Sequence, residues 1–310
     1  MNDNKNGSSH RFTHAAMGTI FEIKICHADF KYAKSASIEL FRLLDQLEQY
    51  LSHFIANSDI SRISNLQCGE STQVSFETFE CLLLCVDMYS LSHGVFDVTI
   101  GELYDCWLNE DKSLKSPSSK QVEEAKNHVG LYHLSFDENR FRVRMESGPV
   151  RLDLGGFGKG YALDKMAELL AEWEITSFAL NGGQSSMLFG DAPLGQTGWP
   201  ITISDPFDDY NRIREFHLKH IAIGGSGLGK GRHIIDPRTA QPLENDRATW
   251  AFAPTAAFAD GLSTTFMLLS HQEIADLCSE FPQFSAIIIQ KNKKPLAKRL
   301  VYIGSMEYDE

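Results

Sequence analysis

The spacing of apolar and polar positions predicts helices early in the chain and mostly strands later. Apolar side chains recur at near-helical intervals in residues 35–54 and again in residues 76–92, which predicts two amphipathic helices. Residues 17–27 alternate between apolar and polar side chains, as a half-buried strand does. Later segments with strand character lie at 175–190, where two strands flank a Gly-Gly turn, and at 199–206, 215–225 and 250–256.

Other segments complete the expected order of elements. A short helix is predicted at 121–130, closed by Gly130, and a β-hairpin after it turns at Asp137–Asn139. A helix is expected from about Asp260, a second one near 271–280, and a closing hairpin from two strands near 284–290 and 298–304. This order predicts an α+β fold with one compact, two-lobed domain over residues 15–310. Residues 1–14 are expected to be a disordered polar N-terminus.

Composition narrows the classes of protein that the chain can belong to. The 310 residues are 43% hydrophobic and 23% charged, which is typical of a protein with a substantial core. The net charge of −12 argues against a general binder of nucleic acid or anionic membranes. Six cysteines show no metal or redox spacing, and no signal peptide, lipobox-like cysteine or membrane span is visible. We therefore expect a cytoplasmic protein without a membrane anchor.

The first candidate site is VRLDLGGFGKGYALDKMAELL, residues 150–170, where a strand-like run gives way to an amphipathic helix. Glycines at the start of a helix let the backbone approach a ligand, and the free helix N–H groups favour an anion. Lys159 adds a positive charge at the same place. The pattern is neither a Walker A loop nor a dinucleotide fingerprint, so a tight corner packed with glycines remains an alternative.

The second candidate is FADGLSTTFMLLS, residues 258–270. Asp260 is expected at a helix N-terminus, with Thr264 four residues later on the same face. Carboxylate and hydroxyl oxygens are hard ligands that suit Mg²⁺. The alternative is that Asp260 is an ordinary helix cap and that Thr264 bonds a backbone carbonyl.

The third candidate is GRHIIDPRTAQP, residues 231–242. His233 precedes a turn that Asp236 and Pro237 are expected to organise. A histidine can act as a base near neutral pH, although one before a turn is also a common structural residue.

The fourth candidate is HGVFDVTIG, residues 93–101. Phe96 offers an aromatic face and Asp97 an acceptor, which together suit a heteroaromatic ring that carries N–H donors. A core phenylalanine followed by an Asx-turn explains the segment equally well.

The order of these segments along the chain resembles the ApbE family of FAD:protein FMN transferases. The resemblance covers about residues 15–305 and rests on segments that occur in matching order: MGT (17–19), YLSHF with SDISRIS (50–64), GVFDVTIGELYDCW (94–107), LDLGGFGKGYALD (152–164), LNGGQSSMLFG (180–190), HIIDPRTAQP (233–242) and ADGLSTTFMLL (259–269). The resemblance implies a T-fold-like ApbE architecture that binds FAD and Mg²⁺ in a shared cleft. The family moves the FMN half of FAD onto a Thr or Ser hydroxyl of an acceptor flavoprotein and releases AMP.

The same resemblance implies a set of site residues, position by position. Asp260, Thr264 and the backbone oxygen of Gly156 match the metal ligands, and His233 matches the histidine that activates the acceptor hydroxyl. The positions that match contacts to FAD are Met17, Phe54, Val95, Phe96, Asp97, Asp153, Lys159 and Ile235.

One segment departs from the family pattern. After the strand near 218–223 the family usually reads Ala-Thr-Ser-Gly, then an acidic or polar residue and Tyr, whereas this chain reads IAIGGSGLGKGRH. Ile223, Gly224 and Gly227 replace the Thr, Ser and Tyr, and the loop before His233 is shorter. Two alternatives therefore stay open beside the transferase: an FAD pyrophosphatase that yields free FMN and AMP, and a flavin-binding paralogue without turnover.

Overall fold

An antiparallel sheet of eight strands is the centre of the molecule, in the order β1-β2-β6-β7-β10-β13-β14-β15. The computed structural model describes residues 8–109, 111, 113–183, 185–208, 212–227, 234–244, 246–291, 295–296 and 299–305. The strands of the large sheet are β1 Ser8–Ala16, β2 Thr19–His27, β6 Phe178–Gly182, β7 Ser186–Phe189, β10 Ile221–Gly227, β13 Arg247–Ala253, β14 Ser285–Gln290 and β15 Leu300–Ile303. Each neighbouring pair is antiparallel, so the predicted α+β class is confirmed.

Three smaller sheets surround the large one. They are formed by β3 Ser71–Gln73, β4 Leu134–Asp137 and β5 Arg142–Met145, by β8 Trp199–Ser204 and β9 Arg212–Leu218, and by β11 Ile235–Asp236 and β12 Gln241–Pro242. The predicted turn at Asp137–Asn139 joins β4 to β5 and is closed by the Asn139 N–H, which donates to the Asp137 side chain.

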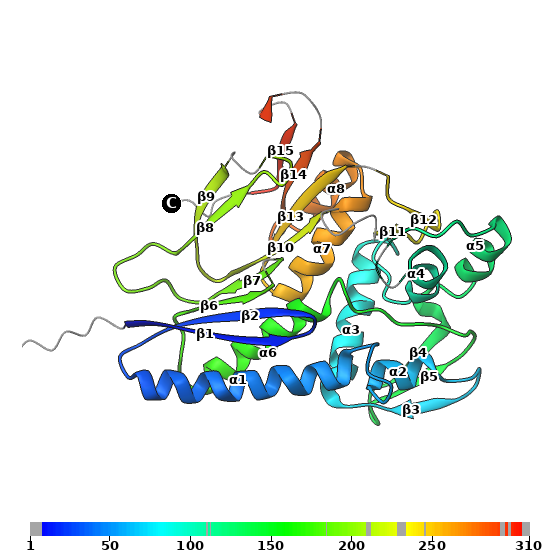
Figure 1. Ribbon diagram of the computed structural model, residues 1–310, viewed down its shortest axis with the longest axis horizontal. Helices are drawn as coiled ribbons and strands as arrows, with labels where there is room; N and C mark the ends of the chain where they lie inside the picture. Colours follow the sequence, from blue (N-terminus) through cyan, green and yellow to red (C-terminus); the bar gives the residue numbers. More distant parts are fainter. Residues whose placement is uncertain are drawn as a thin grey trace, which may run out of the picture.

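The helices are α1 Phe30–Leu51, α2 Asp59–Ser64, α3 Phe76–Leu91, α4 Gly101–Trp107, α5 Ser119–Lys126, α6 Gly158–Glu172, α7 Ala256–Leu268 and α8 His271–Glu280, with a 3₁₀ turn, η1, at Leu131–His133. Figure 1 shows α1 along one edge of the molecule beneath β1 and β2, with α4, α5 and the β11–β12 hairpin gathered at the right. Among the described residues, no helix is long and apolar enough to cross a membrane.

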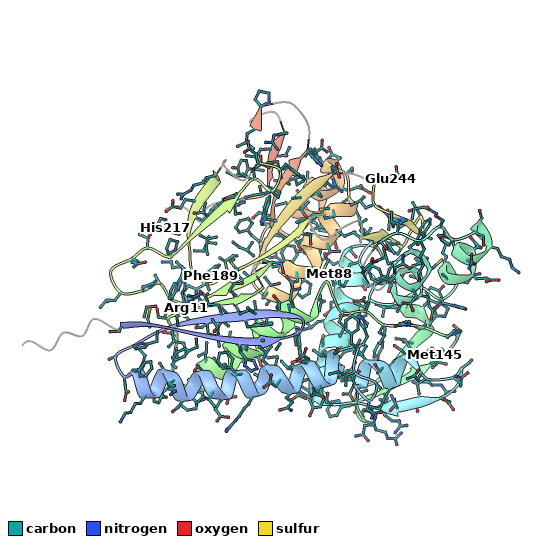
Figure 2. The ribbon with its side chains drawn as sticks, viewed as in Figure 1. Arg11, Met88, Met145, Phe189, His217 and Glu244 are labelled. Atoms are coloured by element: carbon teal, nitrogen blue, oxygen red, sulfur yellow. The ribbon has the colours of Figure 1, made fainter. Side chains whose placement is uncertain are left out.

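Both faces of the large sheet are covered, which explains the apolar run in β10. Ile221 and Ile223 face the β8–β9 hairpin, whereas Ala222 lies in the main core with α1, α3, α6 and α7. Met88 of α3 is fully buried in that core at the centre of the molecule (Figure 2). A third apolar cluster joins α4 and α5 to Ile235 and Ala240.

Four expectations about element boundaries were wrong. Residues 8–14 belong to strand β1, because His10, Phe12 and His14 face inward while the backbone pairs with β2; residues 1–7 lie outside the described residues. The segment 215–225 is two strands in different sheets, separated at His220, whose φ is +54°.

The other two errors concern helix ends. Helix α5 ends at Lys126, before Gly130, which instead precedes the 3₁₀ turn. Helix α7 begins at Ala256, so Asp260 lies in its second turn and is not a cap.

Candidate active site

The loop that leads into α6 is anchored to the segment that follows α3. The Asp153 N–H donates to the Val98 carbonyl at 2.7 Å, and Asp153 Oδ1 accepts the N–H of Gly155 at 2.6 Å. Asp153 Oδ2 lies 4.0 Å from His53 Nδ1, which comes from the end of α1. Three segments far apart in the sequence therefore meet at Asp153.

Gly156 is the point where this loop, Phe96 and α7 converge. A Cβ atom at Gly156 would lie 3.2 Å from Thr264 Oγ1 and 3.4 Å from Phe96 Cε2. A side chain there would crowd both groups, so glycine keeps the backbone open to Thr264. The structure thus brings together Phe96, Gly156 and Thr264, three of the residues that the resemblance implies for the site.

Asp260 is a carboxylate almost removed from solvent, with a relative exposure of 5%. Its Oδ2 accepts the Gly160 N–H at 2.8 Å, and Lys159 Nζ lies 3.9 Å away. Burial raises the pKa of Asp260, while Lys159, the Ser186 hydroxyl and the Gly160 N–H act in the opposite direction. A cation at this position would favour the ionised carboxylate further.

Gly160 explains another part of the glycine-rich sequence. A Cβ there would lie 2.1 Å from the Ala256 carbonyl oxygen, at the start of α7. Only glycine allows α6 and α7 to come this close. Gly160 therefore serves packing, as the alternative interpretation held, whereas the approach of a ligand to the glycine backbone stays a prediction.

The donor chemistry at this point fits a hard divalent cation. Asp260 supplies a carboxylate and Thr264 a hydroxyl one helical turn further on. Gly156, on which a Cβ would lie 3.2 Å from that hydroxyl, supplies a backbone carbonyl. Within the described ranges, no group of three or more His, Cys, Asp or Glu side chains is placed to hold a metal. The predicted metal ligands are one carboxylate, one hydroxyl and one backbone carbonyl, so they do not form a cluster of His, Cys, Asp or Glu side chains.

Asp97 is buried and bound within its own turn. Its Oδ1 accepts the Thr99 N–H at 2.8 Å and the Thr99 hydroxyl at 2.6 Å. Burial raises the pKa of Asp97 to about 6, although the two hydrogen bonds from Thr99 lower it. The turn interpretation therefore holds, and Val95 and Phe96 beside it are buried in the main core. Flavin binding by these three residues stays a prediction.

The remaining predicted residues are more scattered. Phe54 is 86% exposed and its ring lies 3.9 Å from that of His53, which connects it to Asp153. The Met17 N–H donates to Glu48 of α1, and Ile235 is buried in the third apolar cluster. His233 lies outside the described residues.

Two residues beside α7 were missed in the sequence. Asp164, in the first half of α6, accepts the N–H groups of Ala256 and Ala257 at 2.7 and 2.8 Å. The Ser226 hydroxyl lies 2.8 Å from Ser263 Oγ and 3.3 Å from Thr264 Oγ1. Ser226 lies in the segment that departs from the family pattern, and its proximity to Thr264 depends on strand pairing that no local pattern reveals.

The fold and the site define an α+β protein that gathers a carboxylate, a hydroxyl and a glycine backbone at the junction of two helices. The chain belongs to the ApbE family, whose sequence model matches residues 17–288.

Known proteins of similar sequence and fold agree with this assignment. The chain is 25% identical over 283 residues to the FAD:protein FMN transferase of Klebsiella pneumoniae, covering 85% of this chain and 79% of that protein. It is 28% identical over 261 residues to the enzyme of the same name from Chlamydia muridarum, covering 80% of each. The crystal structure of the apo flavinyl transferase ApbE from Pseudomonas stutzeri superimposes with a TM-score of 0.85 at 21% identity, covering 98% of this chain and 97% of that one.

Proposed function

We propose that this protein transfers the FMN half of FAD to a Thr or Ser hydroxyl of an acceptor flavoprotein and releases AMP, with the help of Mg²⁺. The observation that carries the proposal is the convergence of Asp260, Thr264 and Gly156 beside Phe96. Membership of the ApbE family and the names of its relatives support the same activity.

The oxygens of Asp260, Thr264 and Gly156 are the groups that would hold the metal. When bound, Mg²⁺ neutralises charge on the pyrophosphate and stabilises AMP as a leaving group. The chain's own contribution is to keep these oxygens in place: the Gly160 N–H orients the Asp260 carboxylate, and Lys159 lies 3.9 Å from it. Lys159 also adds positive charge for the phosphates.

The flavin end of FAD is assigned to the aromatic side of the site. Phe96 offers its ring edge next to Gly156, and the exposed ring of Phe54 is available for stacking. Val95, Asp97, Asp153, Met17 and Ile235 complete the set expected from the resemblance.

The reaction breaks the phosphoanhydride bond of FAD and forms a phosphoester bond to the acceptor. The acceptor hydroxyl loses its proton, its oxygen bonds to the phosphorus of the FMN half, and the bond from that phosphorus to the bridging oxygen breaks, so that AMP leaves with the bridging oxygen. His233 is the predicted base, because a Thr or Ser hydroxyl is a weak nucleophile unaided.

The test is incubation of the purified protein with FAD, MgCl₂ and an extract of its native host. We expect AMP release together with a fluorescent flavoprotein band on a denaturing gel. Both signals should disappear with EDTA and fall at least about a thousandfold in Asp260→Ala, because metal-assisted charge neutralisation is worth several kcal/mol. Ser118→Ala, which removes only the N-cap of α5, should keep both signals.

The other outcomes discriminate between the alternatives. AMP and free FMN without a labelled protein would identify a pyrophosphatase and overturn the transfer step. Intact FAD with every extract would overturn the enzymatic proposal and leave a flavin-binding protein.

A further inference from the structure

Helix α7 takes its N-terminal cap from another helix. Its own N-cap residue, Thr255, makes no side-chain capping hydrogen bond. The two carboxylate oxygens of Asp164 accept the N–H groups of Ala256 and Ala257 instead, at 2.7 and 2.8 Å. The first turn of a helix needs such acceptors, and here they come from a residue 92 positions earlier in the chain.

The C-terminal end of α7 is also bonded by side chains from outside the helix, here by arginines that donate to its last carbonyls. The guanidinium of Arg247, on β13, donates to the carbonyls of Met267 and Leu269 at 2.8 and 2.7 Å. Arg238, in the turn between β11 and β12, donates to the Leu268 carbonyl at 3.0 Å. A carboxyl group at the N-terminus, when ionised, and positive groups at the C-terminus both match the helix dipole, so side chains from outside fix α7 along its axis.

The predicted metal ligands lie between these two ends. Asp260 is four residues, about one turn, beyond Ala256, and its carboxylate accepts the Gly160 N–H of α6. Gly160 also contacts the Ala256 carbonyl so closely that a Cβ would lie 2.1 Å from it. Helix α6 therefore touches α7 both at Gly160 and at Asp164. The loop with Gly156 leads directly into α6, so the distance from Gly156 to Thr264 depends on how the two helices are aligned.

We propose that Asp164 is a positioning residue that aligns α7 with α6, so that Asp260 and Thr264 face the Gly156 backbone. This inference rests on the proposed function, because the aligned oxygens are the predicted metal ligands. Asp164 acts through the backbone of Ala256 and Ala257, whose N–H groups it accepts.

The experiment measures binding of Mn²⁺, a paramagnetic substitute for Mg²⁺, by the loss of the free-ion EPR signal, with and without FAD. Asp164→Asn places an amide N–H₂ against one of the two backbone N–H groups, so the paired hydrogen bonds are lost. We expect its affinity for Mn²⁺ to fall roughly 10- to 100-fold, the range typical of residues that orient metal ligands. Ser118→Ala, which removes a cap from α5 instead, should bind Mn²⁺ as the wild type does.

A purely structural role for Asp164 would change the melting temperature of Asp164→Asn and leave its Mn²⁺ affinity at the wild-type value, which would overturn the proposal. If circular dichroism shows that Asp164→Asn does not fold, Asp164→Glu replaces it. That variant keeps the carboxylate but lengthens it by one methylene, so α7 should shift and Mn²⁺ affinity should fall. Wild-type affinity in a folded Asp164→Glu would overturn the proposal as well.

Asp260→Ala separates this proposal from the proposed function. If the wild type binds Mn²⁺ and Asp260→Ala does not, the metal site stands and Asp164→Asn alone decides the positioning role. If the wild type binds no Mn²⁺ under either condition, the metal site fails and both proposals fall.

Discussion

Helix α7 is contacted from two sides by glycines, and the two contacts differ in what accompanies them. Gly160 of α6 approaches the Ala256 carbonyl, and Gly224 of β10 approaches the Ala259 carbonyl, each so closely that a Cβ would lie 2.1 Å from the oxygen. On the α6 side, charged groups reach the helix from Asp164 and Lys159. On the β10 side, the contact nearest the predicted ligands is the Ser226 hydroxyl, beside Ser263 and Thr264.

The two glycines pack equally closely against α7, but the polar side chains that accompany them differ. The glycines perform the same steric task, because backbone contact with a helix leaves no room for a side chain. The α6 side adds the carboxyl group of Asp164, whose raised pKa makes its contribution depend on pH, whereas Ser226 adds a neutral hydroxyl. Gly224 stands where the family usually has Ser, and in this chain a Ser side chain at that position would collide with α7.

The largest expected difference between the two sides of α7 is in how their contributions to the free energy of unfolding change with pH. Burial raises the pKa of Asp164 to about 7, the N–H groups of Ala256 and Ala257 lower it, and the charge of Asp260 raises it. The Asp164 carboxyl therefore binds its proton more tightly in the folded protein than in the unfolded chain. The stability that this protonation contributes is fully present below about pH 4 and is lost as the pH rises to about 7. A shift of about three units corresponds to about 4 kcal/mol.

Urea unfolding in EDTA at pH 4, 6 and 8 measures this effect. The free energy of unfolding of the wild type minus that of Asp164→Asn should fall across the range. The same difference taken with Ser226→Ala should stay constant, because no charge is removed on the β10 side. A constant difference for Asp164→Asn would contradict the contrast between the two sides.

A smaller effect on stability is expected when alanine replaces the glycine at each of the two contacts with α7. Gly160→Ala and Gly224→Ala should each lower the free energy of unfolding by about 2–3 kcal/mol, because the new methyl group meets backbone that cannot yield easily. Chemical denaturation of both variants at one pH gives the comparison directly.

Each side of α7 offers a matched control for that experiment. A Cβ at Gly158 would meet only Leu154 Cβ, at 3.6 Å, and one at Gly227 would meet Ala248 Cβ at 3.5 Å, which are ordinary contacts. Gly158→Ala should be neutral or stabilise by up to about 1 kcal/mol, as alanine does in a helix, and Gly227→Ala should change little. Equal losses in all four variants would show that the close approach is not the cause.

The smallest expected effect is that of the Ser226 hydroxyl. Ser226→Ala should cost about 1 kcal/mol of stability, the typical value of one hydrogen bond, and lower the rate of AMP release about three- to tenfold, because Thr264 loses a neighbouring hydroxyl. Ser263→Ala leaves the Ser226–Thr264 contact in place and should lower stability alone. A wild-type rate in Ser226→Ala would show that Thr264 does not depend on Ser226.

The sequence predicted much of this molecule because its signals are local. The helical spacing of 76–92 predicted α3, and the Gly-Gly turn between two strands predicted β6 and β7. Gly156, Thr264 and Phe96 were named as site residues from the resemblance to the family, and the structure places Gly156 against the other two. Their roles in binding metal and flavin stay predictions.

What the sequence did not predict depends on distant partners. Asp260 resembles a helix cap in the sequence, yet α7 begins one turn earlier because Asp164, far away in the chain, caps it. Strand β1 has a polar sequence, so the sequence does not indicate that one of its faces packs against α1. Such long-range contacts leave no periodic trace in the residues themselves.

The antiparallel sheet and the position of α7 also determine when the site can first exist during synthesis. Asp153 and Asp260 are separated by 107 residues, a distance that a ribosome covers in about 5–20 s. Strand β2 is likewise synthesised well before β6, with which it pairs across residues 21–25 and 178–182. The growing chain therefore holds the glycine loop well before the helix that faces it, and no nascent fragment that ends before α7 carries both halves of the site.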